Sequence, residues 1–456
     1  MKKETVTTNQ ITEGVIWKQL LLFFFPIVLG TFFQQLYNTA DTIVVGRFVS
    51  KEALAAVGGS AAQIVGLIVG FFVGLASGAS VIISQFYGAK NRVQLNRALH
   101  TAYAFSIIGS IFITVLGILI APWMLELMHT PQETMADALL YLRIYFAGII
   151  FVFIYNVGSS ILRAMGDSRR PLYYLIVCCI LNIVLDIVLV IVFHMGVPGV
   201  SIATIFSQGV SAVLITRALM RSDDLYQLEF RKIRFHKSAL ISLIWVGCPT
   251  GIQSILYSVT NMLIQTFLNN LGTDTVAAWS AFGKIDSFYW MVNNAFGIAV
   301  TTFVGQNFGA GKYDRMKKSV RIGLCMGLCT ALTLTLIFYN FGTPLFRLFT
   351  SDENVVSIGM QMLHHVAPAY CLFVFIELLS GALRGTGDVV IPMLITCFGV
   401  CLLRIAWLFF IVPLAPGLNT IVLSYPVTWA ITAVMFIVYY CYQAKKWPKS
   451  SAKKTA

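Results

Sequence analysis

Long apolar stretches alternate with short polar segments along the whole chain. Twelve of these stretches have about 20 or more residues, the length that crosses the roughly 30 Å hydrocarbon core of a bilayer as a helix. They lie near residues 18–45, 54–84, 97–122, 137–163, 171–194, 198–219, 240–268, 277–307, 319–346, 358–384, 390–413 and 419–443. Merging or dividing neighbouring stretches would give eleven or thirteen, so the count needs independent support.

Composition indicates the class of protein. Of the 456 residues, 58% are hydrophobic and only 11% are charged. Soluble globular domains carry about 25% charged residues. The chain is therefore expected to be an all-α polytopic membrane protein with the lipid bilayer as its surroundings.

The placement of the positive charge supports twelve helices. The net charge is +13, and the Lys and Arg residues concentrate in the N-terminus, in the loops that follow even-numbered helices and in the C-terminal tail. Only six lie elsewhere: Arg47, Lys51, Arg143, Lys284, Arg347 and Arg404. The positive-inside rule then puts both termini in the cytoplasm, which requires an even number of spans in the cell membrane. Because topology accounts for this charge, no nucleic-acid partner is expected.

Two loop motifs occur twice. QFYGAK begins at Gln85 and QNFGAG at Gln306, while LRAMGDSRRP begins at Leu162 and LRGTGDVVIP at Leu383. Both pairs are 221 residues apart. Equal spacing over such a length indicates that the chain contains two related halves.

The duplication predicts the domain organisation. Pro26 and Pro249, in the first helix of each half, form a third pair. An even number of helices in each half gives both halves the same orientation, so a pseudo-twofold axis along the membrane normal should relate the two six-helix bundles, as in transporters whose halves rock about a central site. One chain holds both halves, so a monomer suffices. The predicted parts are an N-terminal lobe at 1–219, a cytoplasmic linker at 220–238, a C-terminal lobe at 239–444 and a basic cytoplasmic tail at 445–456.

The second repeated loop has a structural interpretation. Its Gly-Asp pair, at Asp167 and Asp388, is typical of a turn, and the proline that follows opens the next helix. Arg163 and Arg384 are expected to anchor helix ends at the membrane interface.

Motifs for catalysis are missing from the sequence. GAGK at 309–312 fails as a phosphate loop, because Gln306 stands where glycine is needed and Tyr313 where Ser or Thr is needed. HExxH, GxSxG and paired CxxC motifs do not occur, and the nine cysteines all lie in apolar segments as small packing residues. Neither an enzyme nor a bound cofactor is expected.

The duplicated Q-x-x-G-A and L-R-x-x-G-D-x-x-x-P motifs resemble those of the multidrug and toxic compound extrusion (MATE) family. The resemblance extends to YNTADTIVVGR at 37–47, to NIVLD at 182–186 and to SIAT at 201–204. It implies a secondary antiporter that exports organic cations and drugs in exchange for H⁺ or Na⁺. The cargo it implies is cationic and amphipathic.

Polar residues within the membrane mark a candidate ion site in the first half. An ionisable residue there costs roughly 2.5–3.5 kcal/mol on insertion scales, so its default interpretation is functional. Three stretches each present one polar face, and burying these faces together predicts one shared site. The members are Gln34, Asn38 and Asp41 in the first helix, Asn182 and Asp186 in the fifth, and Ser201, Thr204 and Gln208 in the sixth.

Two carboxylates, an amide and a hydroxyl suit either of two ions. Oxygen ligands can hold Na⁺, whereas burial and mutual repulsion allow one carboxyl to hold a proton. In proton-coupled MATE proteins, the matching positions are Asp41, Asn182, Asp186 and Thr204. The second half has Ile264 and Trp407 where the repeat aligns Asp41 and Asp186, so coupling is expected in the first half alone.

The second half offers candidates for a substrate cavity. Glu377 is an acid within the membrane and is expected to attract cations. Neighbouring candidates, rich in aromatic, amide and thioether groups, are Gln253, Tyr257, Asn261, Met291 and Asn294. Lys284, Asp286 and Arg404 are interpreted as paired structural charges.

The function expected is a cation-coupled exporter that works by alternating access. One alternative is a lipid-linked saccharide flippase of the same exporter superfamily, which would need a cationic cleft; Lys284 and Arg404 are the only candidate cations against three buried acids. The other is an ion channel, against which the duplicated halves argue.

Overall fold

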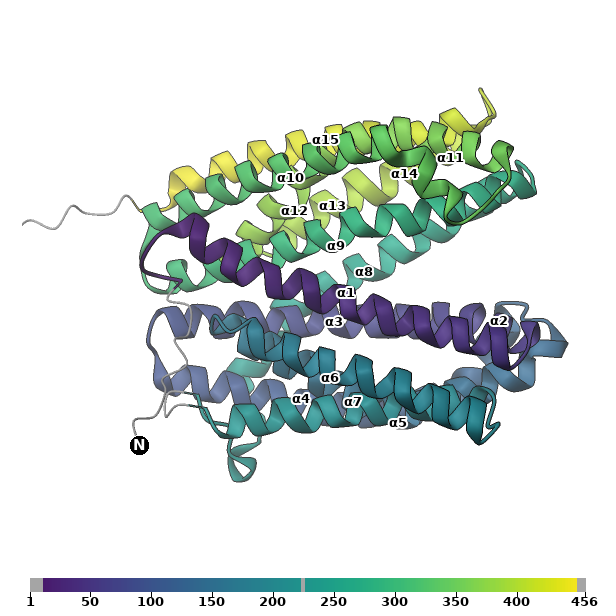
Figure 1. Ribbon diagram of the computed structural model, residues 1–456. Coiled ribbons are helices and arrows are strands. Elements are labelled where there is room, and N and C mark those ends of the chain that lie inside the picture. Colours follow the sequence, from purple (N-terminus) through teal and green to yellow (C-terminus); the bar gives the residue numbers. More distant parts are fainter. Residues whose placement is uncertain (1–10, 223–225, 449–456) are drawn as a thin grey trace, which may run out of the picture. The chain divides into compact units, whose positions relative to one another are not determined.

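The computed structural model describes residues 11–222 and 226–448, and within these ranges all regular structure is helical (Figure 1). Eleven long helical segments there are apolar enough to cross a membrane. A further helix, α9 (Thr273–Gly309), is 37 residues long but carries Lys284 and Asp286 near its middle. The prediction of an all-α polytopic membrane protein is confirmed.

The helices pack into two compact units. The first unit is Phe25–Gly251, and the second comprises residues 11–24 and 252–448. Two helices, α1 (Ile16–Phe48) and α8 (Lys237–Asn269), pass from one unit to the other. Each contains one proline, Pro26 or Pro249, within two residues of that point. Proline removes a backbone hydrogen bond, so both passages occur where a helix bends readily.

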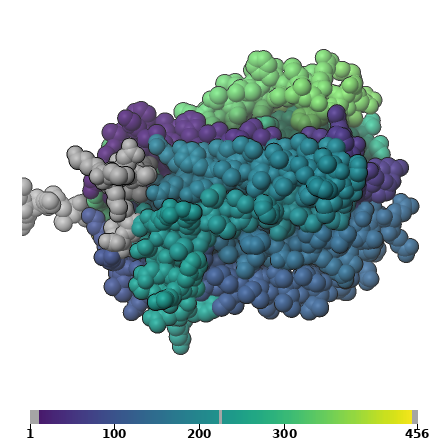
Figure 2. Space-filling view, turned by 60° about the horizontal axis from the view of Figure 1, so that its bottom comes forward, coloured from purple at the N-terminus to yellow at the C-terminus, as the bar shows by residue number. Residues whose placement is uncertain are grey.

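The first unit is organised around one central helix, α5, which packs against α3, α4 and α7, while α7 also packs against α6. Besides α1, its elements are α2 (Lys51–Gly58), α3 (Ser60–Gly88), α4 (Arg92–Leu127), α5 (Gln132–Ala164), α6 (Arg169–Asp186), the π-helical turn η1 (Ile187–Val192), α7 (Val197–Met220) and the short 3-10 turn η2 (Phe230–Lys232). Large apolar side chains such as Phe112 and Leu119 are exposed on its outside. The blue and teal helices make up this unit's face in Figure 2, and its apolar exterior suits contact with lipid.

The second unit repeats this packing. The pair α11–α12 takes the place of α5 and packs against α9, α10 and α15. Besides α8 and α9, its elements are α10 (Tyr313–Arg347), α11 (Glu353–Val366), the 3-10 turn η3 (Ala367–Ala369), α12 (Tyr370–Gly385), α13 (Val390–Thr396), the π turn η4 (Cys397–Leu402), α14 (Leu403–Ala406), the π turn η5 (Trp407–Ile411) and α15 (Leu418–Lys446). Pro368 lies in η3 and accounts for the break between α11 and α12.

Within the first unit, α3 and the start of α8 cross at glycines. A Cβ atom at Gly74 would lie 2.5 Å from the backbone nitrogen of Gly251, and one at Gly78 would lie 2.6 Å from that of Gly247. Both helices therefore carry glycines four residues apart, the spacing that lets two membrane helices approach backbone to backbone. The crossing fixes the side of the unit that faces α8.

Candidate functional site

Four of the predicted coupling residues lie together in the first unit. The hydroxyl of Thr204 on α7 donates a hydrogen bond of 3.2 Å to Oδ2 of Asp41 on α1. The side chains of Asn182 and Asp186, from the last turn and a half of α6, lie next to the same carboxyl group. Asp186 and Asn182 are 0% and 1% exposed, whereas Asp41 is partly buried, with its Oδ1 atom shielded from solvent.

Most polar atoms at this site have no hydrogen-bond partner among the described residues. They are Asp41 Oδ1, both oxygens of Asp186, and both polar side-chain atoms of Asn182. A buried polar atom without a partner costs roughly 1–3 kcal/mol, and more when it is charged. Two adjacent carboxylates also repel each other unless a proton or a cation lies between them. The arrangement can therefore hold a proton shared by the carboxyl groups, or a small cation bound by their oxygens.

Apolar residues close one end of the site. Val44 and Val45 of α1 pack with Val190 of η1 and with Val197 and Val200 of α7 in one buried cluster. This cluster starts one turn beyond Asp41 and adjoins Thr204, whose hydroxyl also contacts the backbone oxygen of Val200. It keeps water from that side of the carboxyl pair.

Sequence reasoning missed one residue near the site. Tyr37 is 5% exposed, and its hydroxyl accepts a hydrogen bond of 3.1 Å from Nε2 of Gln208 on α7. Tyr37 lies four positions before Asp41 and so shares its helix face. That spacing would have identified it, but an aromatic residue in a membrane helix is ordinarily taken as packing.

The backbone beside Asp186 is irregular. The α-helix ends at Asp186, and the π turn η1 follows directly. In the second half, the π turn η5 starts at Trp407, the position that the repeat aligns with Asp186. Such turns are frequent at functional sites in membrane and soluble helices. The irregular backbone is thus kept in both halves, while the acid occurs only in the first.

The polar residues on one face of α1 do not all lie at the carboxyl site. Asn38 and Gln34 are exposed, in contrast to the expectation that this face turns inward as a whole. Gln34 instead lines a separate cavity of the first unit, together with residues of α5 and α6. Seven residues of helix span about 10 Å, so Gln34 and Asp41, at the two ends of this polar face, contact different neighbours.

In the second unit, Glu377 has a partner that was not predicted. Arg384 Nη2 lies 3.1 Å from Glu377 Oε1, and the two side chains are 16% and 24% exposed. Both belong to α12, seven residues apart and on the same face. An arginine therefore compensates the charge of Glu377.

Two other charges of the second unit have different surroundings. Asp286 accepts hydrogen bonds of 2.6 Å from the Tyr370 hydroxyl and from Trp290 Nε1. Arg404 is 3% exposed, and its guanidinium lies 3.9 Å from the centre of the Tyr425 ring. Arg404 forms no ion pair with a described residue, in contrast to the expectation of a paired charge. The exposed Lys284 has no such pair either.

The remaining cavity candidates of the second unit differ in exposure. Tyr257 is partly buried, and it interacts with Gln253 on its own helix and with Glu377 on α12. Met291 is also partly buried, whereas Asn261 and Asn294 are exposed.

Comparison with known proteins identifies the class. The MatE family model matches residues 26–188 and 249–410, one match in each half. The chain belongs to the MATE family, as the repeated motifs indicated; it is a transporter and not an enzyme.

Individual relatives match this chain over most of its length. The chain is 28% identical over 454 residues to the probable multidrug resistance protein YoeA of Bacillus subtilis, a match that covers 97% of each chain. It is 30% identical to the probable multidrug resistance protein YpnP of the same species, over 86% of this chain and 88% of that one. A solved outward-facing structure of a multidrug resistance MATE family transporter superimposes with a TM-score of 0.90 at 21% identity, covering 98% of this chain and 99% of the other. That likeness establishes the fold.

Proposed function

We propose that this protein exports small organic cations and drugs from the cell in exchange for H⁺ or Na⁺, and that the coupling ion binds at Asp41 and Asp186. The observation that carries the proposal is the pair of adjacent carboxyl groups, of the buried Asp186 and the partly buried Asp41, three of whose four oxygens lack a hydrogen-bond partner among the described residues. The names of the relatives YoeA and YpnP, probable multidrug resistance proteins, support the choice of cargo.

The coupling ion acts by compensating charge. An empty site holds two carboxylates in a medium of low dielectric constant, where repulsion is strong. A proton or Na⁺ relieves that repulsion and lets α1 pack against α6 and α7 through Asp41, Asp186 and Thr204. Release of the ion favours a different position of α1, so the occupancy of the site biases the conformation of the lobe.

The second half does not take part in this coupling. Ile264 stands at the position equivalent to Asp41 and is fully buried. Trp407 replaces Asp186, and its indole nitrogen donates to the backbone oxygen of Thr420. The protein is expected to act as a monomer in the cytoplasmic membrane, with both termini in the cytoplasm, because the basic loops follow even-numbered helices.

The test uses purified protein in liposomes, with export of a fluorescent cation measured under a pH gradient and, separately, under a Na⁺ gradient. One of the two gradients should drive export by the unmodified protein. Asp41→Asn and Asp186→Asn should each abolish gradient-driven export. Asp286→Asn is the matched control, since an asparagine there can accept from Trp290 Nε1 through its oxygen and donate to the Tyr370 hydroxyl through its NH2 group. Export at the normal level in the double variant would refute the proposal.

A further inference from the structure

A short segment precedes each of the two helices that pass between the units, and each segment is bound by another helix of the unit in which it lies. Residues 11–14 precede α1 and are bound by α10 within the second unit. Residues 226–236 precede α8 and are bound by α4 within the first unit. The two segments thus hold equivalent places in the two halves of the chain.

An arginine binds the segment of the second unit. The guanidinium of Arg315 donates to the backbone oxygens of Ile11 and Gly14 over distances of 2.8 to 3.2 Å. Lys312 donates to the backbone oxygen of Thr12 at 2.9 Å. Both side chains remain cations between about pH 5 and 8, so this attachment does not depend on pH in that range.

A buried histidine binds the segment of the first unit. His100 of α4 is 2% exposed, and its Nδ1 lies 2.8 Å from the backbone oxygen of Asn96. Its Nε2 lies 3.1 Å from the backbone nitrogen of Glu229. A carbonyl oxygen can only accept and a backbone amide can only donate, so Nδ1 carries the proton and Nε2 carries none. The imidazole of His100 is therefore neutral while the segment is bound.

A second histidine completes the same attachment. Nε2 of His236 accepts a hydrogen bond of 3.3 Å from Nε of Arg234, so the proton of this imidazole is on Nδ1. That Nδ1 lies 3.3 Å from the hydroxyl oxygen of Thr101 on α4, which also accepts from the backbone nitrogen of His236 at 3.2 Å. The imidazole of His236 is therefore neutral as well.

Protonation of either imidazole opposes this arrangement, because Nε2 would become a donor that faces another donor. Positive charge nearby adds to the effect at His236. The pKa of His236 is lowered by burial and then by its neighbours, which are Arg234, Arg97 and His100. The carboxylate of Glu229 pairs with Lys232 instead, at 2.6 Å.

The two halves bind their segments through different side chains. At the 221-residue offset of the repeat, Arg315 corresponds to Gln94. His100 corresponds to Arg321. The second half therefore uses a permanent cation, whereas the first half uses histidine, the side chain whose charge changes between about pH 5 and 8.

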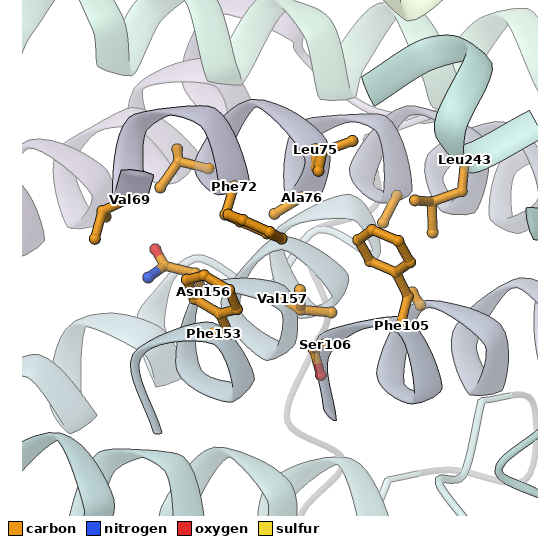
Figure 3. A pocket seen from close by; sticks show the side chains of 13 residues that line it. Val69, Phe72, Leu75, Ala76, Phe105, Ser106, Phe153, Asn156, Val157 and Leu243 are labelled. Atoms are coloured by element: carbon orange, nitrogen blue, oxygen red, sulfur yellow. The ribbon is translucent and has the colours of Figure 1, made fainter. Parts of the chain in front are cut away.

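The start of α8 is also attached to the first unit by contacts that do not titrate. Gly247 and Gly251 lie at the crossing with α3. Leu243 of α8 lies at a small apolar pocket together with Phe105 of α4 (Figure 3). Release of the preceding segment therefore leaves α8 packed on α3 and α4.

We propose that residues 226–236 form a pH-sensitive clasp on the connection between the two halves, bound to α4 while His100 and His236 are neutral and released when they are protonated. Residues 11–14 stay bound under the same conditions. On the topology proposed above, the pH that controls the clasp is that of the cytoplasm. Release converts a connection fixed to α4 into a free one, so a shift of α8 no longer has to displace it.

The test is cleavage of the purified protein by an endoprotease specific for glutamate, which is active at both pH 7.5 and pH 5.5. Each bound segment contains one glutamate, Glu229 or Glu13. The rate of cleavage after each is divided by that of a synthetic peptide of the same sequence at the same pH, so the pH dependence of the protease cancels. The relative rate then reports the released fraction of the segment.

The expected size follows from linkage. An imidazole with the ordinary pKa of about 6.5 that is neutral only in the bound segment raises the released fraction about tenfold between pH 7.5 and 5.5. Relative cleavage after Glu229 should therefore rise about tenfold for one histidine and up to about a hundredfold for both. Relative cleavage after Glu13 should not change.

Variants assign the effect to the two imidazoles. His100→Gln and His236→Gln should each reduce the rise, and the double variant should show the same relative rate at both pH values. His365→Gln, in the second unit, is the matched control and should behave as the unmodified protein does. Thr101→Val has nearly the same shape but lacks the hydroxyl that binds His236, so it should increase cleavage after Glu229 at pH 7.5.

Size-exclusion chromatography at each pH identifies any variant that fails to fold. If relative cleavage after Glu229 does not rise in the unmodified protein, or rises equally in the folded double variant, the inference is wrong. An equal rise at Glu13 would also overturn it, because acid would then loosen both segments. Where a histidine variant does not fold, cleavage of Thr101→Val at the unmodified rate has the same consequence. No gradient is involved and Asp41 and Asp186 are unchanged, so this failure would be separate from failure of the coupling proposal.

Discussion

The crossing of α3 and α8 should be the packing contact most sensitive to a single methyl group. In Gly78→Ala, the new Cβ would lie 2.6 Å from the Gly247 nitrogen, 2.7 Å from its Cα and 2.8 Å from the oxygen of Leu243. The best separation for such atoms is about 3.5 Å or more, so the two backbones must move apart by roughly 0.7–0.9 Å. Backbone atoms cannot rotate away as a side chain can.

The cost follows from that displacement. Overpacking of this kind costs roughly 1–3 kcal/mol, and a gap of 0.5–1 Å forfeits about a quarter to a half of the dispersion energy of the contacts it opens. We expect Gly78→Ala to destabilise the protein by about 2–3 kcal/mol. The assay is thermal unfolding in detergent, followed by fluorescence-detected size-exclusion chromatography.

Gly66 provides the matched control, since it lies in the same helix and nothing is within 4 Å of its added Cβ. There, alanine should be neutral or should stabilise by roughly 0.5–1 kcal/mol through helix propensity. Equal melting temperatures for Gly78→Ala and Gly66→Ala would refute the close-packed crossing.

Three further outcomes are expected. Glu377→Gln should destabilise the second unit by about 1–3 kcal/mol, measured by thermal unfolding, because it leaves the part-buried Arg384 without its counter-charge; an unchanged melting temperature would contradict this. Asp286→Ala should lower the melting temperature more than Asp286→Asn, because asparagine can still accept from Trp290 and donate to the Tyr370 hydroxyl, whereas alanine leaves both side chains without this partner; equal effects would show that these hydrogen bonds contribute nothing. The pKa of His236 is lowered, first by burial and then by the neighbouring Arg234. Protonation of His236 therefore opposes the folded arrangement. The contribution of neutral His236 to folding stability is present above the ordinary His pKa of about 6.5 and is lost as pH falls below that value. The protection of backbone amides in the segment before α8, taken as the hydrogen-exchange rate relative to the intrinsic rate at each pH, should therefore fall between pH 7.5 and 5.5 in the unmodified protein and change less in His236→Gln, whereas identical profiles would refute the assignment to His236.

Much of the architecture could be predicted because the bilayer imposes it. Span length, charge placement and the 221-residue repeat are together sufficient to indicate an all-α chain of about twelve membrane helices. The four residues at the carboxyl site could also be predicted, because polar side chains in membrane helices are few and helical spacing shows which of them share a face.

The rest depended on where helices contact each other along their length. Asn38 lies on the same face of α1 as Asp41, but no sequence pattern tells which neighbour each turn of a 33-residue helix meets. Glu377 and Arg384 are two helical turns apart, a spacing that fits their ion pair. The repeated motif, however, predicted Arg384 only as an anchor of a helix end at the membrane interface. The cavity lined by Gln34 could not be predicted, since it depends on the space left between α1, α5 and α6.

The most direct test of the coupling site is the dependence of cargo affinity on each ion, measured with purified protein and a fluorescent organic cation. Affinity is determined across a pH series without Na⁺, and across a Na⁺ series at constant pH. If the ion bound at Asp41 and Asp186 favours a conformation that releases cargo, one series must weaken cargo binding, by the reciprocity of linked equilibria. The account predicts that this dependence disappears in the double variant Asp41→Asn, Asp186→Asn, and a dependence that survives unchanged in the folded double variant would contradict it.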